Sequence, residues 1–380
     1  MSESIDGREL FAMPDGVAYF NVASLAPQLR AVGEAARGAL EATAEPWRIA
    51  DSDWFDGTER LRSLFAEILG GDSEGVALVS ATSYGLAAAA RNTTAGPGDR
   101  ILLTADDYPS TVYTWRAFAD ECGAEVITVD RLERQSWTEA VLGAIDERTR
   151  VVSVPNVRWT DGARLDLEAI GARTREVGAT LALDLTQSLG AMPFDLSAVR
   201  PDFVVVSGYK WLMGPFGLAY LWVAPEHRLG KPIEHNWINR SNARDFASLT
   251  SYEDDFQPGA RRFDVGQRTN FILTPMAIAA LTQVLDWQPE RLAATLQTKT
   301  DRIEAWAKEQ GLGALGAGER GPHMLEVGLP PSVMEGLSER LAADQVFVGI
   351  RGASGIRVSP HLHIGDAEME SLFESLARAL

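Results

Sequence analysis

Residues 204–217, VVVSGYKWLMGPFG, decide the fold and the chemistry that we predict for this chain. The run of valines is typical of a buried strand, and it ends at Ser207 and Gly208. Lys210 follows at once, and a lysine placed just behind a buried strand is costly unless its charge is paired or its amine is used. The use that we expect is covalent, with the amine forming a Schiff base with a carbonyl cofactor.

A carboxylate ends a second predicted strand upstream. The apolar residues 181–183 lead to Asp184, and a carboxylate at the tip of a buried strand needs a cation. The protonated pyridine nitrogen of pyridoxal phosphate would supply that cation through a charge-assisted hydrogen bond. The protonated ring would then act as an electron sink. Asp184 and Lys210 together therefore predict pyridoxal phosphate as the cofactor.

Asp184, Gln187 and Lys210 resemble the corresponding residues of the fold-type I, class V aminotransferase family. That family includes cysteine desulfurases, carbon–sulfur lyases, isopenicillin N epimerase and small-molecule aminotransferases. The resemblance covers most of the chain, from about Tyr19 to the C-terminus. It implies that Gln187 hydrogen-bonds the phenolic oxygen of the cofactor or the Schiff-base region.

Strands and helices alternate through the first half of the sequence. We expect strands at 75–80, 100–104, 125–129, 150–154, 180–184 and 203–207, with helices between them. Strands rich in Val and Leu that alternate with helices predict a mostly parallel sheet covered by helices on both faces. Ligands of such sheets bind at the carboxyl ends of the strands, where Asp184 and Lys210 fall.

We therefore expect an α/β protein with the architecture of fold-type I transferases. It combines a mostly parallel sheet of the seven-stranded type and flanking helices with a smaller α+β domain at the C-terminus. The expected limits are 1–24 for an N-terminal segment that packs on the small domain, 25–270 for the large cofactor-binding domain, and 271–380 for the small domain.

The segment Ala81, Thr82 and Ser83 follows a predicted strand and opens a predicted helix. Small hydroxylic residues and free N–H groups at a helix start form a cup for phosphate. Taken alone, a simple N-cap by Thr82 or Ser83 would be the better interpretation. Beside Asp184 and Lys210 the phosphate cup is favoured, and the segment is similar to the cup of the family. Ser207 would add a hydroxyl, as the matching family position does; its alternative is a surface turn.

Tyr108 is the candidate for stacking on the pyridine ring, because the family places a histidine or an aromatic ring at this point. A phenol would transfer protons poorly near neutral pH. The alternative is an aromatic residue of a turn that packs on the sheet. Asn156 stands where relatives usually carry a histidine, so Asn156, Arg158 and Trp159 are candidates for the substrate pocket only.

Arg357 lies within residues 356–361, IRVSPH, which resemble the closing motif of the family. The resemblance implies a bidentate contact of its guanidinium with the α-carboxylate of an amino-acid substrate. Arg351 is the fallback. Asn21 and Ala23 resemble the N-terminal segment that touches the same carboxylate.

Gln267 and Thr269 resemble residues of the segment that crosses the dimer interface in the family. The resemblance implies a homodimer in which one of them reaches the cofactor phosphate of the neighbouring subunit. The alternative is a helix N-cap at Thr269 or Asn270.

Composition narrows the possible partners and compartment. The chain has 380 residues, 46% of them apolar, which suffices for a large core, and a formal net charge of −18, which disfavours nucleic acid and anionic membranes. The single cysteine, Cys122, allows no internal disulfide and no cysteine-based metal site. His361 and His363 form the only close histidine pair, and we interpret it as structural, so no metal is expected. Without a signal peptide or an apolar run of membrane-spanning length, we expect a cytoplasmic protein.

These residues predict an enzyme that acts at Cα and Cβ of a small or cysteine-derived amino acid. Arg357 would hold the carboxylate and Lys210 would remove the Cα proton. Residues 312–357 contain no cysteine, which argues against a desulfurase that forms a persulfide. We favour β-elimination by a carbon–sulfur lyase over an aminotransferase and, third, an epimerase. Two other classes stay open: a non-catalytic binding module, and an oxidoreductase that would rest on the glycines of 311–316.

Overall fold

The computed structural model describes residues 5–352 and 355–380, and it is centred on a seven-stranded sheet with the order β2-β8-β7-β6-β5-β3-β4. The strands are β2 (Val76–Val79), β3 (Arg100–Thr104), β4 (Glu125–Val129), β5 (Thr149–Pro155), β6 (Thr180–Asp184), β7 (Phe203–Ser207) and β8 (Ala219–Val223). Neighbouring strands run parallel except at the two edges of β8, which is antiparallel to β2 and β7. The predicted α/β class with a mostly parallel sheet is confirmed.

Strand β8 is the one strand of this sheet that the sequence analysis did not predict. It returns antiparallel to β7, so the connection needs no crossover helix and can be a short loop. Gly208 N donates to Leu218 O at 3.0 Å, and Gly214 N donates to Gly208 O at 2.8 Å. These bonds close the loop that carries Lys210 at the end of β7.

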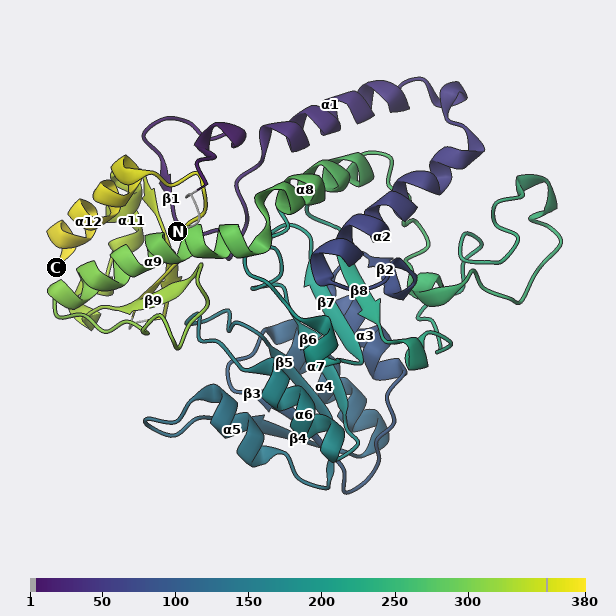
Figure 1. Cartoon of the computed structure of the whole chain (residues 1–380), viewed down its shortest axis with the longest axis horizontal. Coiled ribbons are helices and arrows are strands. Elements are labelled where there is room, and N and C mark those ends of the chain that lie inside the picture. Colours follow the sequence, from purple (N-terminus) through teal and green to yellow (C-terminus); the bar gives the residue numbers. More distant parts are fainter. Residues whose placement is uncertain (1–4, 353–354) are drawn as a thin grey trace.

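Helices cover both faces of the large sheet (Figure 1). Apolar residues of α3 (Thr82–Arg91) and α4 (Pro109–Cys122) share one core with one face of the strands. The other face packs on α2 (Asp56–Leu69), α5 (Trp137–Ala144), α6 (Leu167–Glu176), α7 (Leu196–Val199) and α8 (Leu273–Trp287). Burial on both faces explains why the strands read as continuous apolar runs.

A second, smaller layer lies at the C-terminal end of the chain. Its antiparallel sheet has the order β11-β12-β9, from β9 (Leu325–Gly328), β11 (Gly349–Arg351) and β12 (Gly355–Val358). The helices of this half are α9 (Pro289–Glu309), α10 (Pro331–Met334), α11 (Leu337–Ala343) and α12 (Asp366–Ala379). Near the start of the chain, β1 (Ala18–Tyr19) pairs in parallel with β10 (Val346–Phe347), so both ends of the sequence meet here (Figure 1).

The predicted domain limits stay predictions, and two helices bear on the limit at residue 270. Helix α8 follows that limit but packs against α1 (Arg30–Thr43) and α2, and its apolar residues belong to the core of the large sheet. Helix α9 contributes Leu292 and Leu296 to that core, and Ile303 and Ala307 to the core of the small sheet. The long helix α9 therefore connects the two cores.

Neither a membrane-spanning helix nor a metal-holding cluster is present among the described residues. No helix among them combines the length and the apolar character needed to cross a membrane. No group of three or more His, Cys, Asp or Glu side chains in residues 5–352 and 355–380 is arranged to hold a metal ion.

Candidate active site

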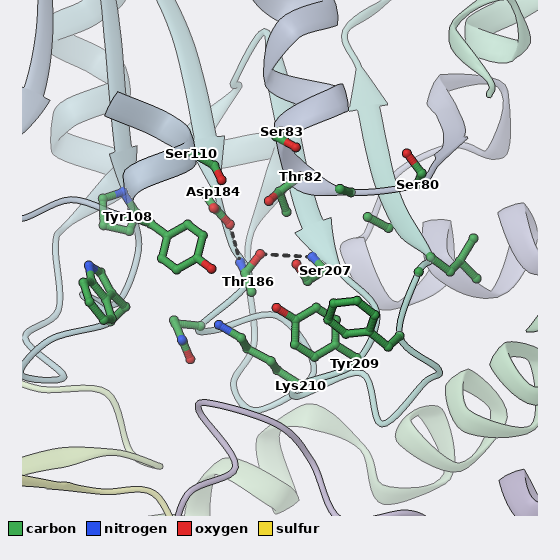
Figure 2. Close-up of a pocket in the computed structure, with 18 of the residues that line it drawn as sticks. Ser80, Thr82, Ser83, Tyr108, Ser110, Asp184, Thr186, Ser207, Tyr209 and Lys210 are labelled. Carbon is green, nitrogen blue, oxygen red and sulfur yellow. Dashed lines mark hydrogen bonds between the residues drawn. The ribbon is translucent and has the colours of Figure 1, made fainter. Parts of the chain in front are cut away.

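A cavity of about 210 Å³ lies at the carboxyl ends of the central strands. Figure 2 shows that its labelled side chains come from strand ends and helix starts that face one another. The lining segments are 80–83 at the start of α3, 107–110 before and in α4, 184–187 after β6, and 207–219 between β7 and β8. This is the edge at which parallel sheets bind ligands, as the sequence analysis expected.

Lys210 is buried in this cavity, with only 6% of its surface exposed. Its amine lies near two phenol rings, with Nζ 5.5 Å from the ring centre of Tyr108 and 5.8 Å from that of Tyr209 (Figure 2). Burial lowers the pKa of the Lys210 amine to about 8, although the nearby Asp184 opposes this shift. A larger share of the amine is therefore uncharged at neutral pH than for an exposed lysine, which suits a nucleophile.

Asp184 ends β6 and faces the cavity from the opposite side. Its Oδ1 accepts a hydrogen bond of 2.9 Å from Thr186 N, and Thr186 Oγ1 in turn accepts one of 3.0 Å from Ser207 N (Figure 2). Burial raises the pKa of the Asp184 carboxyl, despite Thr186 and the positive charge of Lys210. A cation beside this carboxylate would lower the pKa again, so the site favours a positively charged group.

The start of α3 offers unpaired donors to the cavity. Ala81 is the N-cap residue, and no side chain caps the helix there. The first N–H groups of a helix have no partner within the helix, and the hydroxyls of Thr82, Ser83 and Ser207 line the same space. A Cβ at Gly85 would lie only 2.7 Å from Val205 Cγ1, so this glycine lets α3 approach β7 closely. The arrangement is suited to a phosphate group.

The donor set fits pyridoxal phosphate. An amine for the aldehyde, a buried carboxylate for the pyridine nitrogen and a helix start with hydroxyls for the phosphate all line one cavity. The structure thus brings together eight of the residues predicted for the cofactor: Ala81, Thr82, Ser83, Tyr108, Asp184, Gln187, Ser207 and Lys210.

Tyr108 stands at the N-cap of α4, and its ring lies edge-on to Trp159 at 5.7 Å between centres. Its stacking on the cofactor stays a prediction. The neighbouring Asp107 was not predicted as a site residue, although it lines the cavity. Its carboxylate accepts hydrogen bonds from Tyr108 N at 2.7 Å and Thr104 Oγ1 at 3.1 Å, and burial raises its pKa to about 7. Its position directly before the tyrosine was the available sequence signal.

Gln187 also lines the cavity, but its side-chain amide already has protein partners. Its Nε2 donates to Ala23 O at 2.9 Å, and its Oε1 accepts from Trp211 Nε1 at 3.0 Å. The predicted hydrogen bond to the cofactor stays a prediction. These hydrogen bonds give Gln187 a structural role, because they hold the N-terminal segment against the floor of the cavity.

Arg357 lies next to the cavity, on β12 of the small sheet, with 2% of its surface exposed. Its Nη1 donates to Trp159 O at 2.5 Å, and its Nη2 donates to Asn21 Oδ1 at 3.1 Å. Burial, reinforced by the charge of Arg351, lowers the pKa of the guanidinium to about 9. The predicted substrate residues Asn21, Ala23 and Arg357 are thus brought together beside the cavity.

Asn156 is not brought to the cavity. Successive residues of an extended strand point to opposite sides, and here Pro155 and Val157 line the cavity instead. The Asn156 amide donates to Leu165 O at 3.1 Å, and its backbone carbonyl accepts from Leu165 N at 2.8 Å. These bonds hold the chain after β5, and the substrate contact of Asn156 stays a prediction.

Gln267 and Thr269 line a different hollow, together with the aromatic residues Trp54, Trp237 and Phe271. Thr269 Oγ1 donates to Trp54 O. Neither residue lines the cavity of its own chain, and the contact to a second subunit stays a prediction.

Comparisons with known proteins agree with this geometry. The family model described as aminotransferase class-V matches residues 50–315. The chain is 26% identical over 351 residues to the uncharacterized aminotransferase YcbU of Bacillus subtilis (strain 168), covering 88% of this chain and 91% of that protein. It is 31% identical over 263 residues to the kynureninase of Pseudomonas fluorescens, covering 65% of this chain and 60% of that protein.

Two solved structures illustrate the likeness of the fold. One is the enzyme C-DES with glycine covalently linked to its pyridoxal phosphate cofactor, with a TM-score of 0.88, 18% identity, and 98% of this chain and 99% of that chain covered. The other is the cysteine desulfurase of Thermococcus onnurineus NA1, with a TM-score of 0.84, 17% identity, and 100% and 99% covered. The predicted fold-type I architecture is confirmed.

Proposed function

The chain belongs to the aminotransferase class-V family of pyridoxal phosphate enzymes, and from this premise we propose that it is a carbon–sulfur lyase. The reaction is β-elimination from an S-substituted cysteine. The Cα–H and Cβ–S bonds break and the sulfur leaves as a thiol. The remaining three carbons and the amino nitrogen react with water, and the carbons become pyruvate while the nitrogen leaves as ammonia. No oxidant or reductant is needed.

Pyridoxal phosphate supplies the electron sink that makes the Cα proton acidic. The chain supplies the remaining functions. The carboxylate of Asp184 favours a protonated pyridine nitrogen, and the start of α3 with Ser207 binds the phosphate. With the cofactor bound, Lys210 would hold it through its aldehyde carbon, and the amine of Lys210 would serve as the base for the Cα proton. Arg357 binds the substrate carboxylate.

The observation that carries the proposal is the closeness of two phenol rings to the Lys210 amine, since both ring centres lie within 6 Å of Nζ. Elimination needs a base at Cα and a hydrogen-bond donor at the departing sulfur, and the hydroxyls of Tyr108 and Tyr209 are such donors. Burial raises the pKa of the Tyr209 phenol, which keeps its proton in place. The amine would serve at Cα and a nearby phenol at the departing sulfur, so the residues present suit both parts of the elimination.

The position of the only cysteine supports the same choice. Cys122 is the last residue of α4 and is not among the residues that line the cavity. A mechanism that carries sulfur away on an enzyme cysteine therefore has no candidate residue at this site. Release of a free thiol needs none.

An aminotransferase is the second candidate, favoured by the likeness to YcbU over 91% of that protein. Lys210 would then return the proton to the cofactor carbon instead of expelling a substituent from Cβ. Epimerisation is the third candidate, and it would need a proton donor on the opposite face of Cα.

A homodimer is part of the proposal. The hollow at Gln267 and Thr269 is lined by aromatic side chains that are partly exposed in one chain, and Trp237 keeps 40% of its surface exposed. A second subunit would cover these rings and bring one of the two polar side chains to the phosphate of its neighbour. Sedimentation of the holoenzyme at several concentrations measures the mass of the assembly.

The test is a visible absorption spectrum of the holoenzyme during addition of amino acids, S-substituted cysteines included, followed by analysis of the products. We expect the original band to return after each addition while pyruvate, ammonia and thiol accumulate. Stoichiometric conversion to the aminated cofactor with one oxo acid per site would instead indicate the aminotransferase. No band after added pyridoxal phosphate would contradict the proposal as a whole.

A further inference from the structure

One face of the small sheet carries an unusual set of charged side chains. In antiparallel strands, residues that stand opposite one another point to the same side of the sheet. Arg357 stands opposite Gly349 on β11 and opposite Glu326 on β9. Arg351 lies two residues after Gly349, so it shares this face with Arg357 as its diagonal neighbour.

Glycines keep this face open between the two arginines. A Cβ at Gly349 would lie 3.1 Å from Asn21 Oδ1 and 3.4 Å from Arg357 Nε. Gly355 stands opposite Arg351, and a Cβ there would lie 2.9 Å from Glu326 Oε1. The backbone is therefore free of side chains where the charged groups converge.

The two guanidiniums are incompletely paired within residues 5–352 and 355–380. The acceptors of Arg357 are both neutral, the carbonyl oxygen of Trp159 and the amide oxygen of Asn21. Arg351 stacks over the ring of Trp159 at 4.6 Å and forms no ion pair in this part of the chain. The Nε atoms of both arginines are buried without a hydrogen-bond partner.

Glu326 is the one acidic side chain on the same face, and it is a weak partner for two cations. Burial and the nearby Asp161 raise the pKa of its carboxyl. Burial lowers the pKa of Arg351 as well as that of Arg357. One buried and one half-buried guanidinium beside a single acid favour the binding of further negative charge.

This charged face adjoins the cavity through a single residue. Trp159 lines the cavity, meets the ring of Tyr108 and contacts both arginines. An amino acid whose Cα lies near Lys210 would therefore have both guanidiniums on one side.

We propose that Arg351 is a specificity-determining residue that binds a second anionic group, carried by the side chain of the substrate, while Arg357 binds the α-carboxylate. The substrate class is then an amino acid with an acidic side chain, and among S-substituted cysteines one with a terminal carboxylate. The inference rests on the proposed function, which requires an amino acid as the substrate. It goes beyond the proposed function by assigning a second acidic group to that substrate.

The first test compares two nearly isosteric substrates of the holoenzyme, S-carboxymethyl-L-cysteine and its amide, S-carbamoylmethyl-L-cysteine. We expect kcat/KM to be at least roughly tenfold higher for the acid, because a hydrogen bond between charged groups is lost in the amide. In Arg351→Gln the ratio should fall to near one, with the value for the amide changed less than about twofold. Arg351→Lys, which keeps the charge, should retain part of the ratio.

The matched control is Arg164→Gln, which removes an exposed arginine from the loop that follows Trp159. It should keep the wild-type ratio. A ratio near one in the wild-type enzyme, or an unchanged ratio in Arg351→Gln, would overturn the inference. Equal losses for the acid and the amide would show that Arg351 is merely structural, and would overturn it as well.

A second measurement is independent of turnover. Titration calorimetry compares glutarate with its monoamide, glutaramate, as ligands of the holoenzyme, since neither has an amine that can react. Tighter binding of glutarate in the wild type, and equal binding of both in Arg351→Gln, supports the inference even if no cysteine derivative is eliminated. Equal binding in the wild type contradicts it, even if the enzyme proves to be a lyase.

Discussion

The two sides of the cavity are assembled in different ways. The cofactor side comes from one edge of one sheet, where Asp184 and Lys210 follow adjacent parallel strands and Thr82 opens a helix beside them. The substrate side joins Asn21, Trp159 and Arg357, and the first and last of these are 336 positions apart in the chain. A side built from neighbouring strand ends has its geometry fixed by the sheet, whereas a side built from distant segments depends on how the small sheet sits on the large one.

The strongest test of this contrast is to remove the central residue of the cofactor side. Lys210→Ala should lower kcat by roughly a thousandfold or more, because it removes both the covalent attachment and the base. Measuring pyruvate and thiol release is sufficient. The control is Lys231→Ala, an exposed lysine outside the cavity, which should retain activity. Turnover in Lys210→Ala close to that of the wild type would disprove the assignment of the base.

The corresponding change on the substrate side should have a smaller effect of a different kind. Arg357→Gln should lower kcat/KM roughly a hundredfold, since a buried ionic contact to the substrate is lost. The absorption band of the bound cofactor should be unchanged, because no cofactor-side residue is altered. Arg302→Gln, at an exposed arginine of α9, is the control. If the cofactor is lost as well, the two sides are less independent than we infer.

Asn21 tests how the distant segments cooperate. Its side chain orients Arg357, so Asn21→Ala should lower kcat/KM roughly tenfold, mostly through KM. Asn21→Asp should be worse than alanine, because a carboxylate beside Arg357 would compete with the carboxylate of the substrate. A steady-state comparison of the three proteins decides this order. If aspartate restores activity relative to alanine, Arg357 needs a partner in the protein rather than in the substrate.

The same contrast explains what the sequence could and could not predict. Strands β3, β4, β6 and β7 were predicted at their observed limits, since Val- and Leu-rich runs between turn residues have few other interpretations. Strand β8 was missed because residues 219–223 follow β7 after a short glycine-rich loop, without the helix that signals the next parallel strand. The strands of the small sheet are only three or four residues long, so each gives a weaker signal in the sequence than the strands of the large sheet.

In the cavity, residues at strand ends could be predicted from the neighbouring sequence. Contacts between residues distant in the sequence could not. Asp107 and Tyr209 were overlooked although each directly precedes a predicted site residue, because a carboxylate or a phenol in a loop has many solvent-exposed uses. The hydrogen bonds of Gln187 to Ala23 and Trp211 depend on tertiary packing, which no spacing in the sequence encodes. The direction in which the Asn156 side chain points could not be predicted, because it depends on where the strand ends.

Three histidines occupy the boundary between the two sides. His323, His361 and His363 are each fully buried. His323 Nε2 donates to Gln187 O at 2.6 Å, and His363 Nε2 donates to Tyr19 O at 2.7 Å. Neither ring nitrogen of His361 has a partner among the described residues, and the ring packs against Phe11, Trp211 and Trp287. The structure therefore holds these rings neutral in the contact between the N-terminal segment, the small sheet and the cavity floor.

The smallest effect that we predict is a pH dependence of stability at this boundary. Burial lowers the pKa of His323 and His363 to about 4 and that of His361 well below its ordinary value, and Lys299, Arg8 and Arg320 add like charge. Between pH 6.5 and 4 the unfolded chain binds more protons than the native one, so stability is full above pH 6.5 and falls as the pH drops. Each ring lowers the free energy of unfolding by at most about 1.4 kcal/mol per pH unit.

Urea unfolding at pH 7.0 and 5.0 measures this loss of stability. The loss should be smaller in His361→Leu than in the wild type, whereas His235→Gln, at an exposed ring, should match the wild type. An equal loss in His361→Leu would mean that acid weakens the two sides through their carboxylates instead.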